Sequence, residues 1–180
     1  MTKVLIPLAE GCEEMEAVIL IDILRRAGWE VTAAGMEPGP VRCSRGVVLV
    51  PDAAWDEIRS ETFDLLVIPG GGPGTQRLAR DERVLAAAKA FHAAGKRIAA
   101  VCAGPLVLQQ AGLLDGRQAT CHPDVAPRLT RARHVNQPVV VDGVITTSRA
   151  AGTCFALALE LIRQVDGESK VAAVRTGLAM

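Results

Sequence analysis

Short apolar runs alternate along the chain with longer segments in which apolar residues recur at helical spacing. The short runs predict buried strands, and the 3.6-residue period of the longer segments predicts amphipathic helices. We predict strands at Lys3–Leu8, Glu30–Ala34, Asp64–Ile68 and Arg97–Val101, and helices at Glu13–Ala27, Glu82–Ala94, about 103–112, Thr153–Val165 and from Ser169. We predict hairpins within 41–50, around Arg45-Gly46, and within 139–146, with a turn at Asp142-Gly143.

This alternation of strands and helices indicates a single α/β domain over residues 1–180. The expected architecture is a doubly wound, mostly parallel sheet with helices on both faces. A chain of this length can bury a proper core in one domain. In such sheets ligands bind beyond the carboxyl ends of the strands, so chemistry is expected just after Ile68 and Val101.

Composition and charge narrow the class of protein. Hydrophobic residues make up 49% of the chain and charged ones 22%, which is typical of a soluble globular protein. The 20 Lys and Arg residues balance the 20 Asp and Glu residues, so no net field favours nucleic acid or an anionic membrane. The apolar run at the start is too short for a signal peptide, and no later run approaches the length of a membrane span.

The cysteines are scattered, at positions 12, 43, 102, 121 and 154. An odd number without a Cys-x-x-Cys pair argues against a disulfide framework or a structural zinc site, and predicts a reducing cytoplasm. We interpret Cys12, Cys121 and Cys154 as ordinary small residues. Cys121 and His122 are adjacent but lack a third ligand, so no metal site is predicted.

One cysteine stands where a predicted strand runs directly into a helix. Ala100-Val101-Cys102-Ala103-Gly104 has the spacing of a nucleophile elbow, small-x-nucleophile-x-Gly, with Ala100 replacing the first glycine. The turn is so tight that larger side chains beside the nucleophile would clash. The positive end of the following helix favours a thiolate, which predicts a Cys102 pKa between about 5 and 7. The alternative is a small, inert core cysteine in a generic α/β binding domain.

A run of glycines, Pro69-Gly70-Gly71-Gly72-Pro73-Gly74, ends the strand at Ile68. Consecutive glycines let backbone N–H groups approach a reacting atom as an anion nest or oxyanion hole. A flexible turn is the alternative. The run lacks the G-x-G-x-x-G spacing of a dinucleotide site, and no Gly-Lys-Ser/Thr of a P-loop follows.

Glu16 shares the apolar stripe of the first predicted helix with Ile19, Leu20 and Ile23. A buried carboxylate needs a partner or a neutral state, whereas a first-turn acid that simply reaches solvent needs neither. We expect Glu16 to lie near Cys102. An ionised Glu16 would raise the pKa of the thiol, and a protonated one would donate a hydrogen bond to the thiolate. Burial favours the protonated form.

Seven short segments follow one another along nearly the whole chain: Glu13-Glu14-Met15-Glu16-Ala17-Val18, Arg25-Arg26-Ala27-Gly28, Cys43-Ser44-Arg45, Pro69-Gly70-Gly71, Val101-Cys102-Ala103-Gly104-Pro105, Cys121-His122-Pro123 and Thr147-Ser148-Arg149. Together they resemble the ThiJ/PfpI superfamily, and within it the branch of the parkinsonism-associated protein deglycase. The acidic helix combined with the Cys-Ala-Gly-Pro elbow is the specific part of the match. Pro-Gly-Gly alone is not specific.

The resemblance implies a flavodoxin-like fold, usually a homodimer, in which an oxidation-prone Cys102 is hydrogen-bonded by a protonated Glu16. It also implies that Cys43 lies near the dimer interface. By the same matching, His122 would sit beside the cysteine, and an oxyanion or substrate would be bound by Gly70, Gly71, Ala103, Arg45 and Arg149.

The implied activities are glyoxalase chemistry, from methylglyoxal to lactate, and deglycation of early glyoxal adducts, without metal or organic cofactor. The implied partners are small aldehydes, glycated side chains and a second copy of the chain. A redox sensor or redox-regulated chaperone whose Cys102 oxidises to sulfinate is the alternative. Peptidase and amidotransferase activities are disfavoured, because residue 103 is Ala rather than the histidine of protease-like members and His122 follows Cys102 by only 20 residues.

Overall fold

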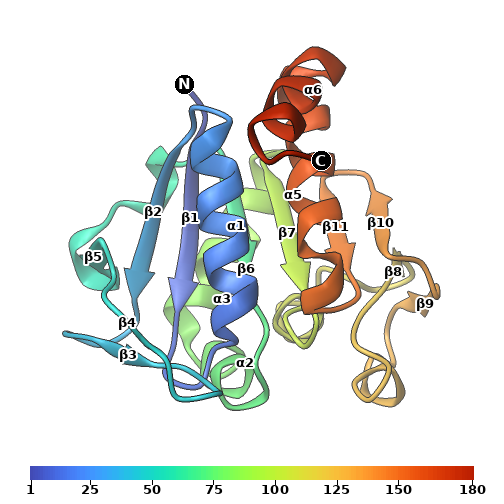
Figure 1. Ribbon diagram of the computed structural model, residues 1–180. Coiled ribbons are helices and arrows are strands. Elements are labelled where there is room, and N and C mark those ends of the chain that lie inside the picture. The colour runs from blue at the N-terminus through green and yellow to red at the C-terminus, as the bar shows by residue number, and fades with distance from the viewer.

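The computed structural model describes residues 1–180 and contains a seven-stranded central sheet between two layers of helices (Figure 1). The strands of this sheet are β1 (Lys3–Leu8), β2 (Glu30–Gly35), β5 (Ala53–Ala54), β6 (Leu65–Ile68), β7 (Arg97–Val101), β10 (Val139–Asp142) and β11 (Ile145–Ser148). Their order is β10-β11-β7-β6-β1-β2-β5. Only β10 is antiparallel to its neighbour, so the predicted mostly parallel, doubly wound sheet is confirmed.

Helices cover both faces of the sheet (Figure 1). One face carries α1 (Glu14–Arg26), α5 (Cys154–Asp166) and α6 (Glu168–Gly177), and the other carries α2 (Gly72–Leu78), α3 (Glu82–Ala93) and α4 (Pro105–Gln110). Successive side chains of a strand point to opposite faces. In β1, Val4 and Ile6 therefore join the core under α1 and α5, whereas Leu5 joins the core under α3 and α4.

Both predicted hairpins are present. β3 (Val41–Arg42) pairs with β4 (Val48–Leu49), and β10 pairs with β11. The remaining small elements are β8 (Gln118–Ala119), β9 (Arg133–His134) and the 3-10 turns η1 (Trp55–Glu57), η2 (Ser60–Thr62), η3 (Ala126–Arg128) and η4 (Ala151–Thr153). The short parallel pair β8–β9 lies where the sequence predicted no element, because two-residue strands leave no periodic pattern.

Helix α2 begins inside the glycine run, for which the sequence predicts an anion nest or a flexible turn and no helix. It begins at Gly72, with Gly71 as its N-cap and Pro73 in its first turn. Glycine and proline have the lowest helix propensities, so local preference argued against a helix here. Proline is nevertheless accepted in the first turn, where its missing N–H has no partner to lose. Packing of the buried Leu78 against the sheet stabilises the helix.

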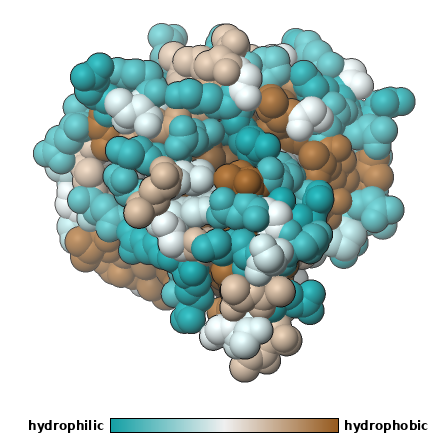
Figure 2. Space-filling model, turned by 90° about the horizontal axis from the view of Figure 1, so that it is seen from above, coloured by the Kyte–Doolittle hydropathy of each residue, from teal (hydrophilic) through white to brown (hydrophobic).

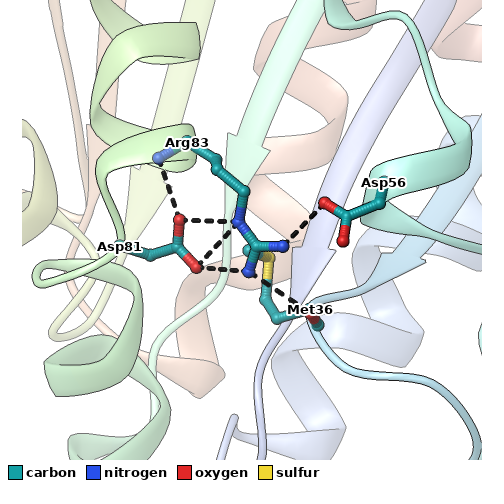
Figure 3. A network of polar contacts seen from close by, with 4 residues as sticks. All are labelled: Met36, Asp56, Asp81 and Arg83. Carbon is teal, nitrogen blue, oxygen red and sulfur yellow. Dashed lines mark hydrogen bonds and ion pairs between the residues drawn. The ribbon is translucent and has the colours of Figure 1, made fainter.

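Arg83 fastens the start of α3 to two distant segments (Figure 3). Its guanidinium contacts Asp81 at 2.6 Å, Asp56 in η1 at 2.7 Å and the carbonyl oxygen of Met36 at 3.4 Å. Asp81 also caps α3 by accepting a hydrogen bond from the Arg83 N–H at 2.9 Å. The hydrogen bonds from Arg83 lower the pKa of Asp81. This network holds the loop after β2 against the helical layer.

The carboxyl ends of β1, β6 and β7 lie at one end of the sheet, and the N terminus and α6 lie at the other (Figure 1). The end near the N terminus and α6 is covered mainly by hydrophilic residues, with hydrophobic ones in separate patches (Figure 2). None of the helices combines the length and the apolar character needed to cross a membrane. The carboxyl ends of the strands bring together Cys102, Glu16 and the glycine run.

Candidate active site

Cys102 occupies the tight turn between β7 and α4. Its φ is +62°, in the left-handed region that residues other than glycine rarely adopt. Its N–H donates to the Ser148 carbonyl at 3.0 Å, and its own carbonyl accepts from the His122 N–H at 3.0 Å. A Cβ on Gly104 would lie 2.7 Å from the Ile68 carbonyl oxygen, so the turn requires glycine there. This is the geometry of a nucleophile elbow.

Glu16 projects from the first turn of α1 into the protein interior and is 1% exposed. The helix start is fixed by Glu13, whose carboxylate accepts a hydrogen bond from the Glu16 N–H at 2.7 Å. Glu16 Oε2 accepts a hydrogen bond from the Gly70 N–H at 2.7 Å. Its Oε1 is buried without a hydrogen-bond partner, and the carboxyl lies close enough to the Cys102 thiol for each group to shift the pKa of the other. The first turn of α1 therefore places a carboxyl group beside the Cys102 turn.

Gly70 lies between the carboxyl and the thiol. A Cβ on this residue would be 2.6 Å from Glu16 Oε2 and 2.7 Å from Cys102 Cβ. Real Cβ atoms do not approach other atoms so closely without displacing them. Glycine at position 70 is therefore what permits Glu16 and Cys102 to meet.

Glu16 and Cys102 perturb one another. Burial raises the pKa of Glu16 to about 7, although the hydrogen bonds to Gly70 and Cys102 oppose the rise. Burial also raises the pKa of Cys102 to about 12, helped by the negative charge and the hydrogen bond of Glu16. The backbone N–H groups of Gly71 and Ala103 act in the opposite direction.

The sequence-based expectation of a Cys102 pKa between about 5 and 7 is thus wrong for the state in which Glu16 is ionised. That expectation counted the positive end of a helix but neither burial nor a facing carboxylate, and α4 has only 6 residues. When Glu16 holds the proton, its charge no longer raises the pKa of the thiol. The neutral carboxyl can then donate a hydrogen bond to the thiolate, which lowers that pKa. The two groups are a coupled pair in which a thiolate requires the proton on Glu16.

The backbone N–H groups of Gly71 and Ala103 lie near the Cys102 sulfur and lower the pKa of its thiol. Gly71 has a φ of +88°, and a Cβ there would lie 2.4 Å from the Gly11 carbonyl oxygen. When the sulfur attacks a carbonyl carbon, the carbonyl oxygen comes to lie beside the sulfur. The two N–H groups near the sulfur are then close to that oxygen as well. The arrangement suits an oxyanion hole.

Half-buried Cys102 opens into a cavity of about 390 Å³, a size suited to a small molecule. The cavity is lined by Glu13, Ser44, Arg45, Gly71, Gly72, Pro73, Cys102, Ala103, His122 and Val125. Glu16 does not line it and contacts Cys102 from the protein interior. The thiol is therefore approached by a ligand from the cavity and by the carboxyl from the interior.

Comparison with known proteins agrees with this architecture. The model of the DJ-1/PfpI family matches residues 2–164. The chain belongs to the DJ-1/PfpI family. The resemblance inferred from the seven sequence segments is therefore confirmed, and so is the flavodoxin-like fold.

Relatives within the DJ-1/PfpI family cover almost the whole chain. Protein dj-1beta of Drosophila melanogaster is 38% identical over 97% of this chain and 95% of its own. The crystal structure of Drosophila melanogaster DJ-1beta has a TM-score of 0.96 and 37% identity, covering 99% of this chain and 98% of that one. The glutathione-independent glyoxalase DJR-1.2 of Caenorhabditis elegans is 36% identical over 89% of this chain and 87% of its own. The deglycase PYRAB04690 of Pyrococcus abyssi is 32% identical over 89% of this chain and 98% of its own. The names of these relatives support an enzymatic activity of the glyoxalase or deglycase kind in this family.

Of the other three predicted site residues, two line the cavity and one does not. His122 lines the cavity, but its Nδ1 accepts a hydrogen bond from the Asp124 N–H at 3.2 Å and its ring makes none with Cys102. Arg45 also lines the cavity. Arg149 does not, and its guanidinium donates to Asn136 at 3.0 Å. The predicted role of Arg149 in substrate binding stays a prediction, because Arg149 does not line this cavity.

Sequence reasoning missed two parts of the site. Ser44 lines the cavity because its hydroxyl donates to the buried Glu14 carboxylate at 3.0 Å. That carboxylate also accepts from the Arg45 N–H at 2.9 Å and so holds the hairpin loop against α1. Glu13 both lines the cavity and caps α1. An acidic residue just before a helix signals a cap, but only the folded chain shows that the capped end faces a cavity.

Proposed function

We propose that this protein is a cofactor-independent glyoxalase or deglycase that acts on methylglyoxal-type 2-oxoaldehydes or their early protein adducts. The observation that carries the proposal is the contact of a half-buried Cys102 with a buried carboxyl, beside two backbone N–H donors and an open cavity. A reducing cytoplasm, where the five cysteines stay free thiols, suits this chemistry. Methylglyoxal is the first substrate to test.

Reaction begins when the substrate aldehyde lies against Cys102 in the cavity. The thiolate, formed with the proton held on Glu16, attacks the aldehyde carbon and forms a C–S bond. The carbonyl electron pair moves to oxygen, and the N–H groups of Gly71 and Ala103 stabilise the resulting oxyanion. Glu16 gives its proton to that oxygen, which forms a hemithioacetal and leaves Glu16 as a carboxylate that can act as a base. No metal or organic cofactor enters this step.

An internal proton transfer then converts the hemithioacetal into a thioester. The proton on the former aldehyde carbon leaves to a base, and the neighbouring ketone carbon receives a proton, so the oxidation of one carbon balances the reduction of the other. We assign this transfer to Glu16, whose pKa of about 7 suits a group that both takes and gives a proton, with His122 on the cavity side. Water hydrolyses the thioester, which releases lactate and restores the Cys102 thiol.

The test is lactate formation from methylglyoxal without glutathione. Wild-type protein should turn over, and Cys102→Ser and Glu16→Ala should each lose at least about 100-fold in kcat/KM. Lys89→Ala is the control, since Lys89 is exposed on α3 and does not line the cavity. Turnover of Cys102→Ser equal to that of wild type would remove the nucleophile from the mechanism.

A redox sensor or redox-regulated chaperone is the second candidate, and one observation favours it. The N–H groups of Gly71 and Ala103 and the carboxyl of Glu16 surround the sulfur, and they could hold the oxygens of a Cys102 sulfinate. This function needs no turnover. A wild-type protein that forms no lactate but whose Cys102 is oxidised to sulfinate by peroxide would favour the sensor over the enzyme.

We also propose a homodimer. Met15 and Val18 on α1 are 55% and 47% exposed, and Val47, Val48 and Val50 of the adjoining hairpin are 48%, 50% and 81% exposed. Figure 1 shows that β3 and β4 lie near the beginning of α1. A second copy that covers these side chains would remove apolar surface from water. Analytical ultracentrifugation of wild type and Val18→Glu should show a dimer and a monomer, respectively.

A further inference from the structure

Two buried thiols lie together outside the catalytic pair. The sulfur atoms of Cys12 and Cys43 are 3.6 Å apart, and the residues are 0% and 5% exposed. Both cysteines are free. No other two cysteines of the chain are in side-chain contact at hydrogen-bond distance, and the proposed mechanism uses neither of these two.

Backbone hydrogen bonds hold the two cysteines face to face. The Gly11 N–H donates to the Arg42 carbonyl at 2.8 Å, and the Ser44 N–H donates to the Cys12 carbonyl at 2.8 Å. These bonds flank Cys43 on both sides, so the segment at 11–12 and the start of the hairpin loop run side by side. A disulfide bond is about 2.05 Å long, so the sulfurs need to approach by only about 1.5 Å.

We propose that Cys12 and Cys43 form a reversible disulfide, an oxidation site distinct from Cys102. With a peroxide as oxidant, the Cys43 sulfur attacks one peroxide oxygen, the O–O bond breaks, and a sulfenic acid and water or an alcohol form. The Cys12 sulfur then attacks the Cys43 sulfur, the S–O bond breaks, and water leaves with the Cys12 proton. The two thiols lose two electrons in total, and the peroxide gains them. Thiol reductants reverse the reaction.

Cys43 is the sulfur that meets the oxidant first. It is the more exposed of the two and borders the exposed loop residues Arg45 and Gly46, whereas Cys12 is completely buried. Burial raises the pKa of both thiols, with a further rise from the negative charge of Glu14 nearby. The reaction is therefore slow at neutral pH and depends on opening of the hairpin loop. Such a site responds to sustained oxidation rather than to a brief exposure.

The disulfide would join two walls of the catalytic cavity. Glu13 follows Cys12 directly, Ser44 and Arg45 follow Cys43, and all three line the cavity beside Cys102. In the reduced protein these walls are held together by hydrogen bonds to the Glu14 carboxylate. Oxidation adds a covalent link between segments 31 residues apart in the chain.

The test uses the full-length Cys102→Ser variant, so that the catalytic cysteine takes no part. Folded protein is treated with increasing hydrogen peroxide, quenched in acid, unfolded, alkylated with iodoacetamide and digested for mass spectrometry. We expect a peptide pair linked through Cys12 and Cys43, an intact mass lower by two hydrogens, and recovery of both thiols with dithiothreitol. Cys121→Ser in the same background is the matched control and should keep the link.

A sample that is unfolded in urea before oxidation serves as the reference. It gives the peroxide concentration at which disulfides form between thiols that no fold holds together. If Cys12 and Cys43 are both alkylated in folded protein at and above that concentration, the proposal is wrong. A link from either cysteine to Cys121 or Cys154 instead would also overturn it. Cys12→Ala and Cys43→Ala should each abolish the linked peptide, and the mapping in Cys102→Ser decides the question even if one of them does not fold.

Discussion

Glu16 Oε2 accepts a hydrogen bond from the Gly70 N–H at 2.7 Å, which ties the first turn of α1 to the end of β6. The bond crosses 54 residues of sequence and joins two elements that meet only in the folded sheet. It places the carboxyl beside Cys102 and leaves the N–H of the next residue, Gly71, free to reach the sulfur. This hydrogen bond therefore fixes the position of the carboxyl beside the thiol.

Replacing Gly70 with Ala should disrupt the site. The new Cβ would lie 2.6 Å from Glu16 Oε2 and 2.7 Å from Cys102 Cβ, so one of them must move. Overpacking of this kind lowers the free energy of unfolding by about 1–3 kcal/mol. We expect that loss in urea denaturation, together with loss of lactate formation.

Gly72→Ala is the matched control for Gly70→Ala. A Cβ on Gly72 meets nothing within 4 Å, and Gly72 lines the cavity beside Cys102. Gly72→Ala should therefore keep wild-type stability within about 0.5 kcal/mol. Equal effects of the two substitutions would show that the close contact at Gly70 is not what matters.

The reactivity of Cys102 at pH 6 should depend on Glu16. At that pH, below the Glu16 pKa of about 7, the carboxyl is mainly protonated and can donate a hydrogen bond to the thiolate. A hydrogen bond to a charged group is worth about 1.5 kcal/mol or more, so Glu16→Ala should slow iodoacetamide labelling of Cys102 about tenfold. Glu16→Gln keeps a neutral hydrogen-bond donor, so its labelling rate should lie between the rates of wild type and Glu16→Ala.

His122→Ala serves as the control in the labelling experiment, because the His122 ring makes no hydrogen bond with the thiol. It should change the labelling rate less than Glu16→Ala does. Labelling of Cys102 in Glu16→Ala that matches or exceeds the wild-type rate at pH 6 would mean that Glu16 is ionised beside the thiol and acts only by repulsion.

The pH dependence of stability should reveal the buried carboxyl. The pKa of Glu16 rises from 4.5 to about 7 on folding, so its contribution to stability is present below pH 4.5 and is lost as the pH rises through 7. The loss amounts to roughly 3 kcal/mol. In a Cys102→Ser background, Glu16→Gln should therefore gain stability relative to Glu16 between pH 5 and pH 8, measured by urea denaturation.

Glu14 provides a control of opposite sign. Burial of Glu14 raises its pKa, but hydrogen bonds from Ser44, Arg45 and Val47 outweigh burial and lower it. Its contribution is present above the unfolded pKa and is lost as the pH falls. Glu14→Gln should thus lose stability relative to wild type more at pH 8 than at pH 3. The same pH trend in both variants would contradict the assignment of opposite shifts.

The backbone of Cys102 should prefer glycine. Its φ of +62° costs a residue with a Cβ about 1–2 kcal/mol, which glycine avoids. Cys102→Gly should therefore unfold at higher urea than Cys102→Ala, by about 0.5–1 kcal/mol in the free energy of unfolding. Ala103→Gly is the control, since Ala103 does not have a positive φ and its replacement should destabilise the protein. A less stable Cys102→Gly would show that the elbow is not strained.

Much of the framework could be predicted because local signals and tertiary demands agree. The strands Lys3–Leu8 and Arg97–Val101 have the predicted bounds, since their apolar runs are buried on both faces of a parallel sheet. Helix α1 has the acidic start and basic end that mark a helix. Helix α2 escaped prediction because its glycines and proline disfavour a helix locally, and only packing stabilises it.

By itself, the sequence determined the strand-to-helix elbow at Cys102, the glycines that follow Ile68 and the acidic residue on the apolar stripe of α1, because each is set by local geometry or by helical period. The tertiary structure decided what these pieces do together. It buried Glu16 against Gly70 and the thiol, which reversed the direction expected for the Cys102 pKa. It also brought Cys12 within 3.6 Å of Cys43. Contacts and desolvation arise between elements distant in sequence, so no local pattern contains them.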